Sequence, residues 1–127
     1  FIELGTALVD RFGRGARLSI YGHVGDGNVH FNVLAPAGVN ASMFLEEIST
    51  EVSPRIYDLV AKMDGSFSAE YGLGQDKLSL DQTYGDPIKR NLMRTFKNVL
   101  DPREIMNPGK VVSSRNVMSD EKEVQCL

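Results

Sequence analysis

The sequence predicts an α+β fold in which an antiparallel sheet carries its helices on one face. Apolar and polar residues alternate on both sides of Asp26-Gly27, which is typical of a β-hairpin. Helical spacing of apolar residues precedes the hairpin and follows it, and a short strand is expected over 66–69. The resulting order, α-β-β-α-β, is the ferredoxin-like order lacking its first strand. That strand is central in the fold, so its absence indicates a piece of a longer polypeptide.

The first helix is expected over residues 1–12. Leu4, Leu8 and Phe12 recur every four residues and form one apolar stripe. Glycines directly after Phe12 are typical of a helix end, so the chain should leave the helix there.

The hairpin is expected from about residue 16 to 35, with a two-residue type I′ turn at Asp26-Gly27. This turn places His23 directly opposite His30. Because side chains alternate across a strand, the hairpin acquires two unlike faces. The polar face would hold Tyr21, His23, His30 and Asn32, and the apolar face Ile20, Val24, Val29, Phe31 and Val33.

Two later helices have recognisable starts. Asn40 is a predicted N-cap, and Gly65 ends the helix, in which Ser53-Pro54 either starts a new helix or kinks the old one. Asp86 and Pro87 predict the cap and first turn of the last helix. The apolar stripes of the two helices are Phe44, Ile48, Val52, Ile56, Leu59 or Val60, and Met63, and then Ile88, Leu92, Phe96, Val99 and Leu100.

Composition limits the classes of function. A net charge of −3 argues against nucleic acid and anionic membrane surfaces as main partners. No apolar run approaches the roughly 20 residues of a transmembrane helix, and no signal peptide is visible. Cys126 has no second cysteine with which to form an internal disulfide. We therefore expect a cytoplasmic protein.

The polar face of the hairpin carries both histidines of the chain. Directly opposed residues have Cβ atoms roughly 4.5–5.5 Å apart, which lets two imidazoles converge on one ion. A divalent metal needs at least one further ligand, which these strands do not identify. The alternative is a solvated hairpin face that happens to carry two histidines.

Three motifs, taken together and in order, carry a resemblance to a known family: Gly22-His23-Val24-Gly25-Asp26-Gly27-Asn28-Val29-His30, then Glu70-Tyr71-Gly72, then Asn107-Pro108-Gly109-Lys110. Over about residues 1–112 the chain resembles the C-terminal part of the FAD-linked oxidases. These oxidoreductases include D-lactate dehydrogenases, glycolate oxidase subunits and D-2-hydroxyglutarate dehydrogenases.

The resemblance implies roles for particular residues. His23, His30 and Glu70 correspond to the ligands of a divalent metal, usually zinc or a similar ion. Asn32 corresponds to an asparagine that contacts substrate, and the turn at Asn107 would lie near the flavin.

The resemblance also implies how the chain is organised. FAD would be bound by an N-terminal domain of the same polypeptide. Residues 1–84 would be the substrate-facing cap segment, and 85–112 the helix and turn that return to the flavin domain. Residues 113–127 lack apolar periodicity and are expected to be a flexible tail.

Position 71 departs from the family pattern, which has a histidine between the glutamate and the glycine. That histidine looks like the general base that takes the substrate's hydroxyl proton. Tyrosine has an ordinary pKa near 10, so forming the phenolate at pH 7 would cost about 4 kcal/mol. Either Tyr71 is a metal-activated base, or another group takes the proton, or the protein does not oxidise a 2-hydroxy acid.

The expected function is therefore that of an FAD-dependent dehydrogenase or oxidase of a small 2-hydroxy acid, with a metal orienting the substrate and hydride passing to flavin. This segment alone is expected to be inactive. One alternative is a catalytically degenerate cap that binds a metal or a carboxylate ligand. The other is a hydrolase with a His-His-Glu metal site.

Overall fold

The computed structural model describes residues 1–113. Its contacts divide the chain into two compact units, Phe1–Ala69 and the residues from Glu70 onward. We describe each unit by itself. The tail predicted over 113–127 lies, apart from its first residue, outside the described residues.

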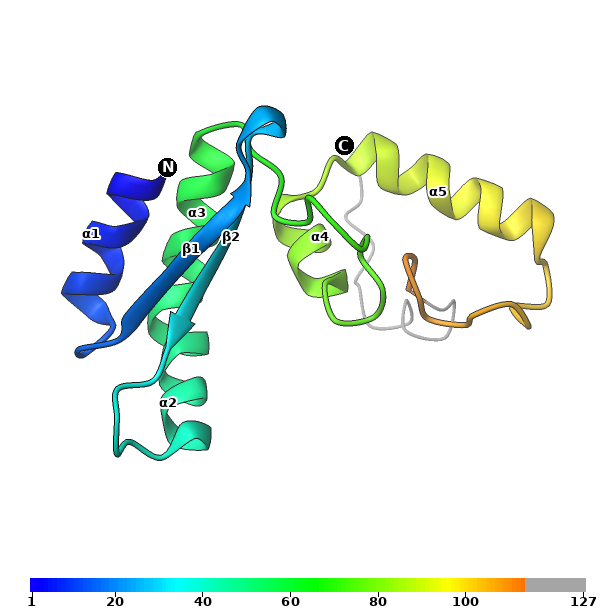
Figure 1. Ribbon diagram of the computed structural model, residues 1–127. Coiled ribbons are helices and arrows are strands. Elements are labelled where there is room, and N and C mark those ends of the chain that lie inside the picture. The colour runs from blue at the N-terminus through cyan, green and yellow to red at the C-terminus, as the bar shows by residue number, and fades with distance from the viewer. Residues whose placement is uncertain (114–127) are drawn as a thin grey trace, which may run out of the picture. The chain divides into compact units, whose positions relative to one another are not determined.

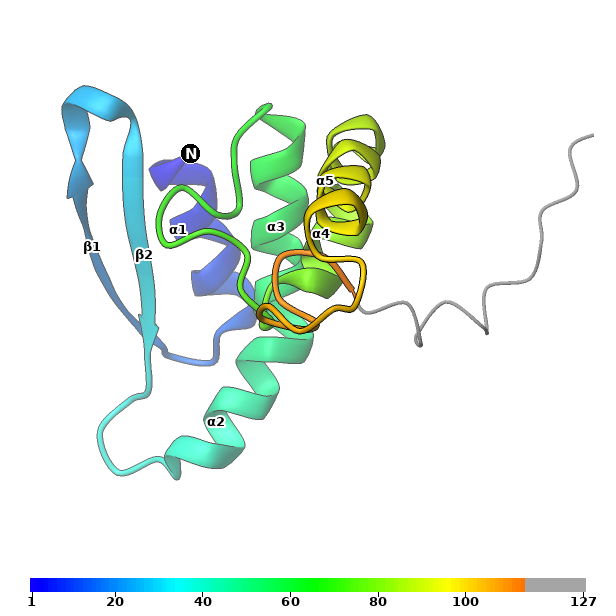
Figure 2. The same ribbon diagram turned by 90° about the vertical axis from the view of Figure 1, so that its right-hand side faces the viewer.

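The first unit is a β-hairpin with helices packed on one of its faces (Figures 1 and 2). Helix α1 precedes the hairpin, and the α2–α3 segment follows it, so the predicted α+β class is confirmed. The elements are α1 (Ile2–Phe12), β1 (Arg17–His23), β2 (Asn28–Leu34), α2 (Ala41–Glu47), a π-helical stretch η2 (Ile48–Val52) and α3 (Ser53–Lys62).

A small apolar core joins these helices to the hairpin. Four buried side chains form its centre, namely Val9, Phe44, Ile48 and Val52. Three of them come from the predicted stripe of the second helix, and Phe31 on the apolar face of β2 packs against them. The apolar face of the hairpin is therefore covered, and its polar face is turned away from the core.

The cap and the proline of the second helix behave as their chemistry requires. The Asn40 side chain accepts hydrogen bonds from the backbone N–H groups of Ser42 and Met43 at 3.0 and 3.2 Å, which confirms the N-cap. Pro54 lies in the first turn of α3, which begins at Ser53 directly after η2, so the alternative in which Ser53-Pro54 starts a new helix is confirmed. The missing N–H of proline is tolerated there, because the first N–H groups of a helix have no partner within it.

The prediction of a strand over 66–69 was wrong, since these residues form bends and irregular structure. Within residues 1–113 the sheet has two strands, β1 and β2. A hollow of about 240 Å³ is lined by β2, α3 and Phe67. The ferredoxin-like order assigns a strand to this place, and without it the 66–69 segment has no neighbouring strand with which to pair.

The second unit contains α4 (Leu78–Tyr84), which was not predicted, and α5 (Pro87–Leu100), which was. Asp86 caps α5 by accepting hydrogen bonds from the N–H groups of Ile88 and Lys89 at 2.8 and 3.4 Å. Asp81 is buried on α4 and pairs with Arg90 of α5, with 2.8 Å between Oδ2 and Nε. The predicted apolar stripe of α5 is exposed to solvent in this unit.

Asp101 organises the segment that follows α5. Its carboxylate accepts hydrogen bonds from Lys97 Nζ at 2.5 Å and from the backbone N–H groups of Ile105 and Met106 at 3.0 and 2.9 Å. The hydrogen bond from Lys97 is the main cause that lowers the pKa of Asp101, and the two N–H groups lower it further against the opposing effect of desolvation. The carboxylate thereby fixes the start of the loop that leads to Asn107.

Among the described residues, no helix is both long and apolar enough to cross a bilayer.

Candidate metal centre

The hairpin that carries the histidines has a different register from the predicted one. His30 pairs with Tyr21, and His23 pairs with Asn28, so the two histidines are not directly opposed. A type I′ turn would need positive φ at both Asp26 and Gly27, and only Gly27 has it, at 65°. The strands are instead joined by a four-residue loop with a 3₁₀ turn, η1 (Val24–Asp26), before Gly27.

The shift keeps the predicted faces because it moves the pairing by two residues, an even number. Tyr21, His23, His30 and Asn32 still share one face. Val24 is the exception, since it lies in the loop and is 93% exposed rather than on the apolar face.

Gly22 allows the two strands to come close beside the histidines. It pairs with Val29, and a Cβ built on it would collide with the backbone carbonyl oxygen of Asn28. Any other residue would push the strands apart at the position directly before His23. The close approach of the two strands therefore explains why this position of the motif is a glycine.

The two imidazoles are diagonal neighbours across the strands. Their ring centroids lie 6.2 Å apart with planes inclined at 45°. The ring of Tyr21 stacks on that of His30, with centroids 5.0 Å apart and planes 15° from parallel. The alternation of side chains predicted that Tyr21 lies on this face but not that it stacks on His30, because the stack depends on the register.

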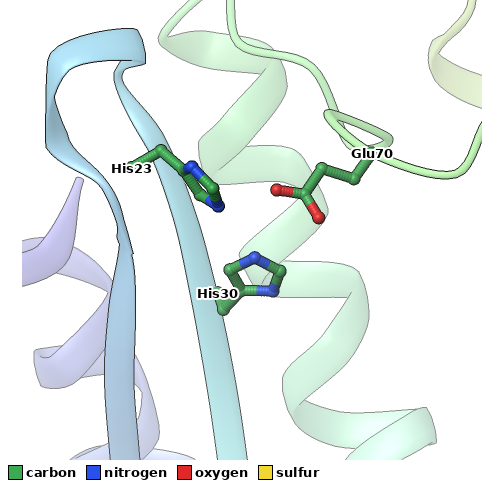
Figure 3. A group of neighbouring side chains, drawn as sticks. All are labelled: His23, His30 and Glu70. Atoms are coloured by element: carbon green, nitrogen blue, oxygen red, sulfur yellow. The ribbon is translucent and has the colours of Figure 1, made fainter.

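Glu70, the residue directly after Ala69, brings a carboxylate to the two rings (Figure 3). One ligand atom from each of His23, His30 and Glu70 lies within 4.8 Å of the others. Ligand bonds of about 2.1 Å in a tetrahedral zinc site place neighbouring ligand atoms roughly 3.4 Å apart. Rotations of the side chains that move the ligand atoms by about an ångström would close that difference. The three residues therefore fit a divalent metal in both donor type and spacing.

Asn32 lies on the same face of β2 as His30, two positions further along. Its side-chain Nδ2 donates a hydrogen bond to the backbone carbonyl of Ser19 at 3.2 Å. This contact across the strands holds the amide beside the histidines, where the resemblance predicts substrate binding.

Tyr71 follows Glu70 but does not pack against the protein. Its side chain is 96% exposed, and its backbone has a φ of 61°, which is uncommon for an aromatic residue. The catalytic role of Tyr71 therefore stays a prediction.

Asn107 lies in the exposed loop beyond α5 and also has positive φ, at 46°. Its carbonyl accepts a hydrogen bond from the Lys110 N–H at 3.3 Å, and the Val111 N–H donates to the Gly74 carbonyl at 2.7 Å. The loop after Asn107 is thus hydrogen-bonded to the loop after Glu70, a link that the separate motifs did not predict. The flavin contact of Asn107 stays a prediction.

Comparison with known proteins identifies the family. Residues 1–111 match the model of the FAD linked oxidases, C-terminal domain. The chain is 37% identical over 94 residues to D-2-hydroxyglutarate dehydrogenase of Stutzerimonas stutzeri, a match that covers 74% of this chain and 20% of that protein. It is 40% identical over 95 residues to the mitochondrial D-2-hydroxyglutarate dehydrogenase of Rattus norvegicus, covering 75% of this chain and 17% of that protein.

A third relative has a different substrate in its name. The D-lactate dehydrogenase of Archaeoglobus fulgidus is 40% identical over 99 residues, covering 77% of this chain and 20% of that protein. The matches therefore span a fifth or less of the length of these three relatives. The match of the family model over residues 1–111 shows that the chain belongs to the FAD-linked oxidases as a C-terminal domain.

Proposed function

We propose that this chain is part of an FAD-dependent dehydrogenase of a small 2-hydroxy acid, in which His23, His30 and Glu70 hold a divalent metal, with zinc as the first candidate. The convergence of two imidazoles and a carboxylate within 4.8 Å is the observation that carries the proposal. Membership of the FAD-linked oxidases supports the redox class, and the names of the relatives support the class of substrate.

The charge of the ligand set suits an anionic substrate. Two neutral imidazoles and one carboxylate leave a divalent metal with a net charge of about +1 and with open coordination positions. A 2-hydroxy acid presents a carboxylate and a neighbouring hydroxyl, which together match those positions. When bound, the metal supplies Lewis-acid polarisation of the hydroxyl, and FAD, held by an N-terminal domain, supplies the hydride acceptor.

The residues of the chain orient the substrate in this proposal. Asn32 contributes an amide fixed to β1 through the Ser19 carbonyl. Tyr71 occupies the position of the family's proton acceptor, and its exposure favours a proton acceptor elsewhere over a metal-activated phenolate. Asn107 is proposed to approach the flavin.

Two alternatives use the same three ligands. A catalytically degenerate cap would bind the metal or a carboxylate ligand without turnover, and the tyrosine at position 71 is the feature that favours it. A metal hydrolase would need a general base separate from the ligands, and membership of a flavin-linked family argues against it.

Metal analysis of the full-length, flavin-loaded protein tests the proposal. The His23→Ala/His30→Ala double variant should lose the bound metal and the oxidation of 2-hydroxy acids together, while keeping its flavin absorbance. Asp10→Asn is the matched control, since it removes an exposed carboxyl group on α1. Unchanged metal content in the double variant would place the metal elsewhere. Metal loss without loss of activity would separate the metal from the reaction.

A further inference from the structure

Tyr21 packs against the face of a proposed metal ligand, His30. It pairs directly with His30 across the strands, and the two rings are stacked at 5.0 Å and 15°. The Tyr21 side chain is nevertheless 62% exposed, so its ring adds little to the apolar core. What it covers is one face of the His30 imidazole.

Such a stack constrains the ring that it covers. The second side-chain torsion of histidine has a broad energy profile, so the backbone alone does not decide where the imidazole nitrogens point. A parallel aromatic neighbour restricts rotation of the imidazole about that torsion, because rotation would break the face-to-face contact. With the ring plane held, a nitrogen of His30 stays directed toward His23 and Glu70.

The surroundings of His23 in the hairpin differ from those of His30. The residue paired with it is Asn28, and its own side chain is exposed while that of His30 is half-buried.

We propose that Tyr21 is a positioning residue that orients the His30 imidazole for metal binding. The inference rests on the proposed metal site and assigns a new role within it. The aromatic ring carries this role and the hydroxyl does not, because the contact with His30 is between ring faces.

Zinc titration of the full chain tests the role. Tyr21→Phe keeps the ring and should leave the Kd for Zn²⁺ within about twofold. Tyr21→Val removes the ring but keeps strand propensity, and it should raise that Kd about 10- to 100-fold, as the loss of groups that orient metal ligands commonly does. Leu34→Ala is the matched control, since Leu34 is exposed on the same face at the other end of β2 and should leave the Kd unchanged.

The outcomes separate this inference from the proposed function. A Kd unchanged in Tyr21→Val, with binding lost in His30→Ala, would overturn the role of Tyr21 and leave the metal site standing. Binding unchanged in His30→Ala would overturn both. Nuclear Overhauser contacts between the two rings in zinc-loaded wild type give a check that needs no variant, and their absence would overturn the proposal.

Discussion

His23 and His30 are diagonal neighbours on one face of the hairpin, with ring centroids 6.2 Å apart, and each has a different residue directly opposite it. Diagonal positions lie farther apart than opposed ones, yet long side chains still meet across them. Tyr21 therefore occupies the position directly opposite His30. The geometry of the proposed metal site therefore depends on the four-residue loop that sets the register.

Gly22 should be intolerant of any side chain. Gly22→Ala would drive a Cβ into the Asn28 carbonyl oxygen and should destabilise the fold by about 1–3 kcal/mol, the usual cost of overpacking. Thermal or denaturant unfolding measures this change. Gly25→Ala is the control, because a Cβ there meets no atom within 4 Å, and equal effects of the two substitutions would contradict the steric explanation.

The loop beyond α5 should loosen in acid. The pKa of Asp101 is lowered in the fold, mainly by the hydrogen bond from Lys97, so its ionised form stabilises the fold. That contribution is complete above the ordinary aspartate pKa of about 4 and is lost as the pH falls through the lowered value. Hydrogen exchange at the Ile105 and Met106 amides, which donate to Asp101, should accelerate relative to the rest of the chain in that range.

Asp101→Asn provides the control for this pH dependence. The amide keeps an acceptor oxygen but cannot ionise, so the excess exchange should already be present at neutral pH and should not grow in acid. An acid-induced change of the same size in the variant would assign the effect to another group.

Two substitutions in the full-length, flavin-loaded protein test the role of Tyr71 in the reaction. If the tyrosine is a poor replacement for a general base, Tyr71→His should raise kcat on 2-hydroxy acids, by up to the roughly 10²- to 10⁴-fold typical of a positioned base. If the tyrosine serves a different substrate, the same change should abolish the native activity and create none.

Tyr71→Phe removes only the hydroxyl. Since the side chain is 96% exposed, this change should leave the rate nearly unaltered unless the hydroxyl takes part in proton transfer. Steady-state rates decide between these cases, and unchanged rates in both variants would remove Tyr71 from the mechanism.

Local signals in the sequence predicted much of the fold, because the interactions behind them join residues that are close together in the sequence. Asn40 and Asp86 cap their helices through N–H groups two and three residues away. Phe44, Ile48 and Val52 supply three of the four buried core side chains, because their spacing of four residues places them on one face of the helical segment.

The elements that were missed depend on distant or subtle interactions. Helix α4 holds its buried Asp81 through Arg90, nine residues away, and no local pattern shows such a pair. The hairpin register depends on whether Asp26 adopts positive φ, which a sequence of the Asp-Gly type favours but does not require. The prediction that His23 and His30 share one face is confirmed nevertheless, since an even shift in register keeps both on it.

Residues 1–127 alone should be colourless after purification. In the proposed function FAD is held mainly by another domain, and this chain matches a family of C-terminal domains. Absorbance between 400 and 500 nm, measured after addition and removal of free FAD, checks this. A stoichiometric flavin spectrum retained by these residues would contradict the proposed division of roles.

X-ray absorption spectroscopy of the metal-loaded, full-length protein tests the proposed metal centre most directly. Two imidazole ligands and at least one carboxylate oxygen are expected, at about 2.0–2.2 Å from zinc. His30→Ala should remove one imidazole contribution, and Glu70→Gln should weaken zinc binding. A spectrum without imidazole scattering, or one that is identical in wild type and His30→Ala, would contradict the assignment of His23, His30 and Glu70 as the ligands.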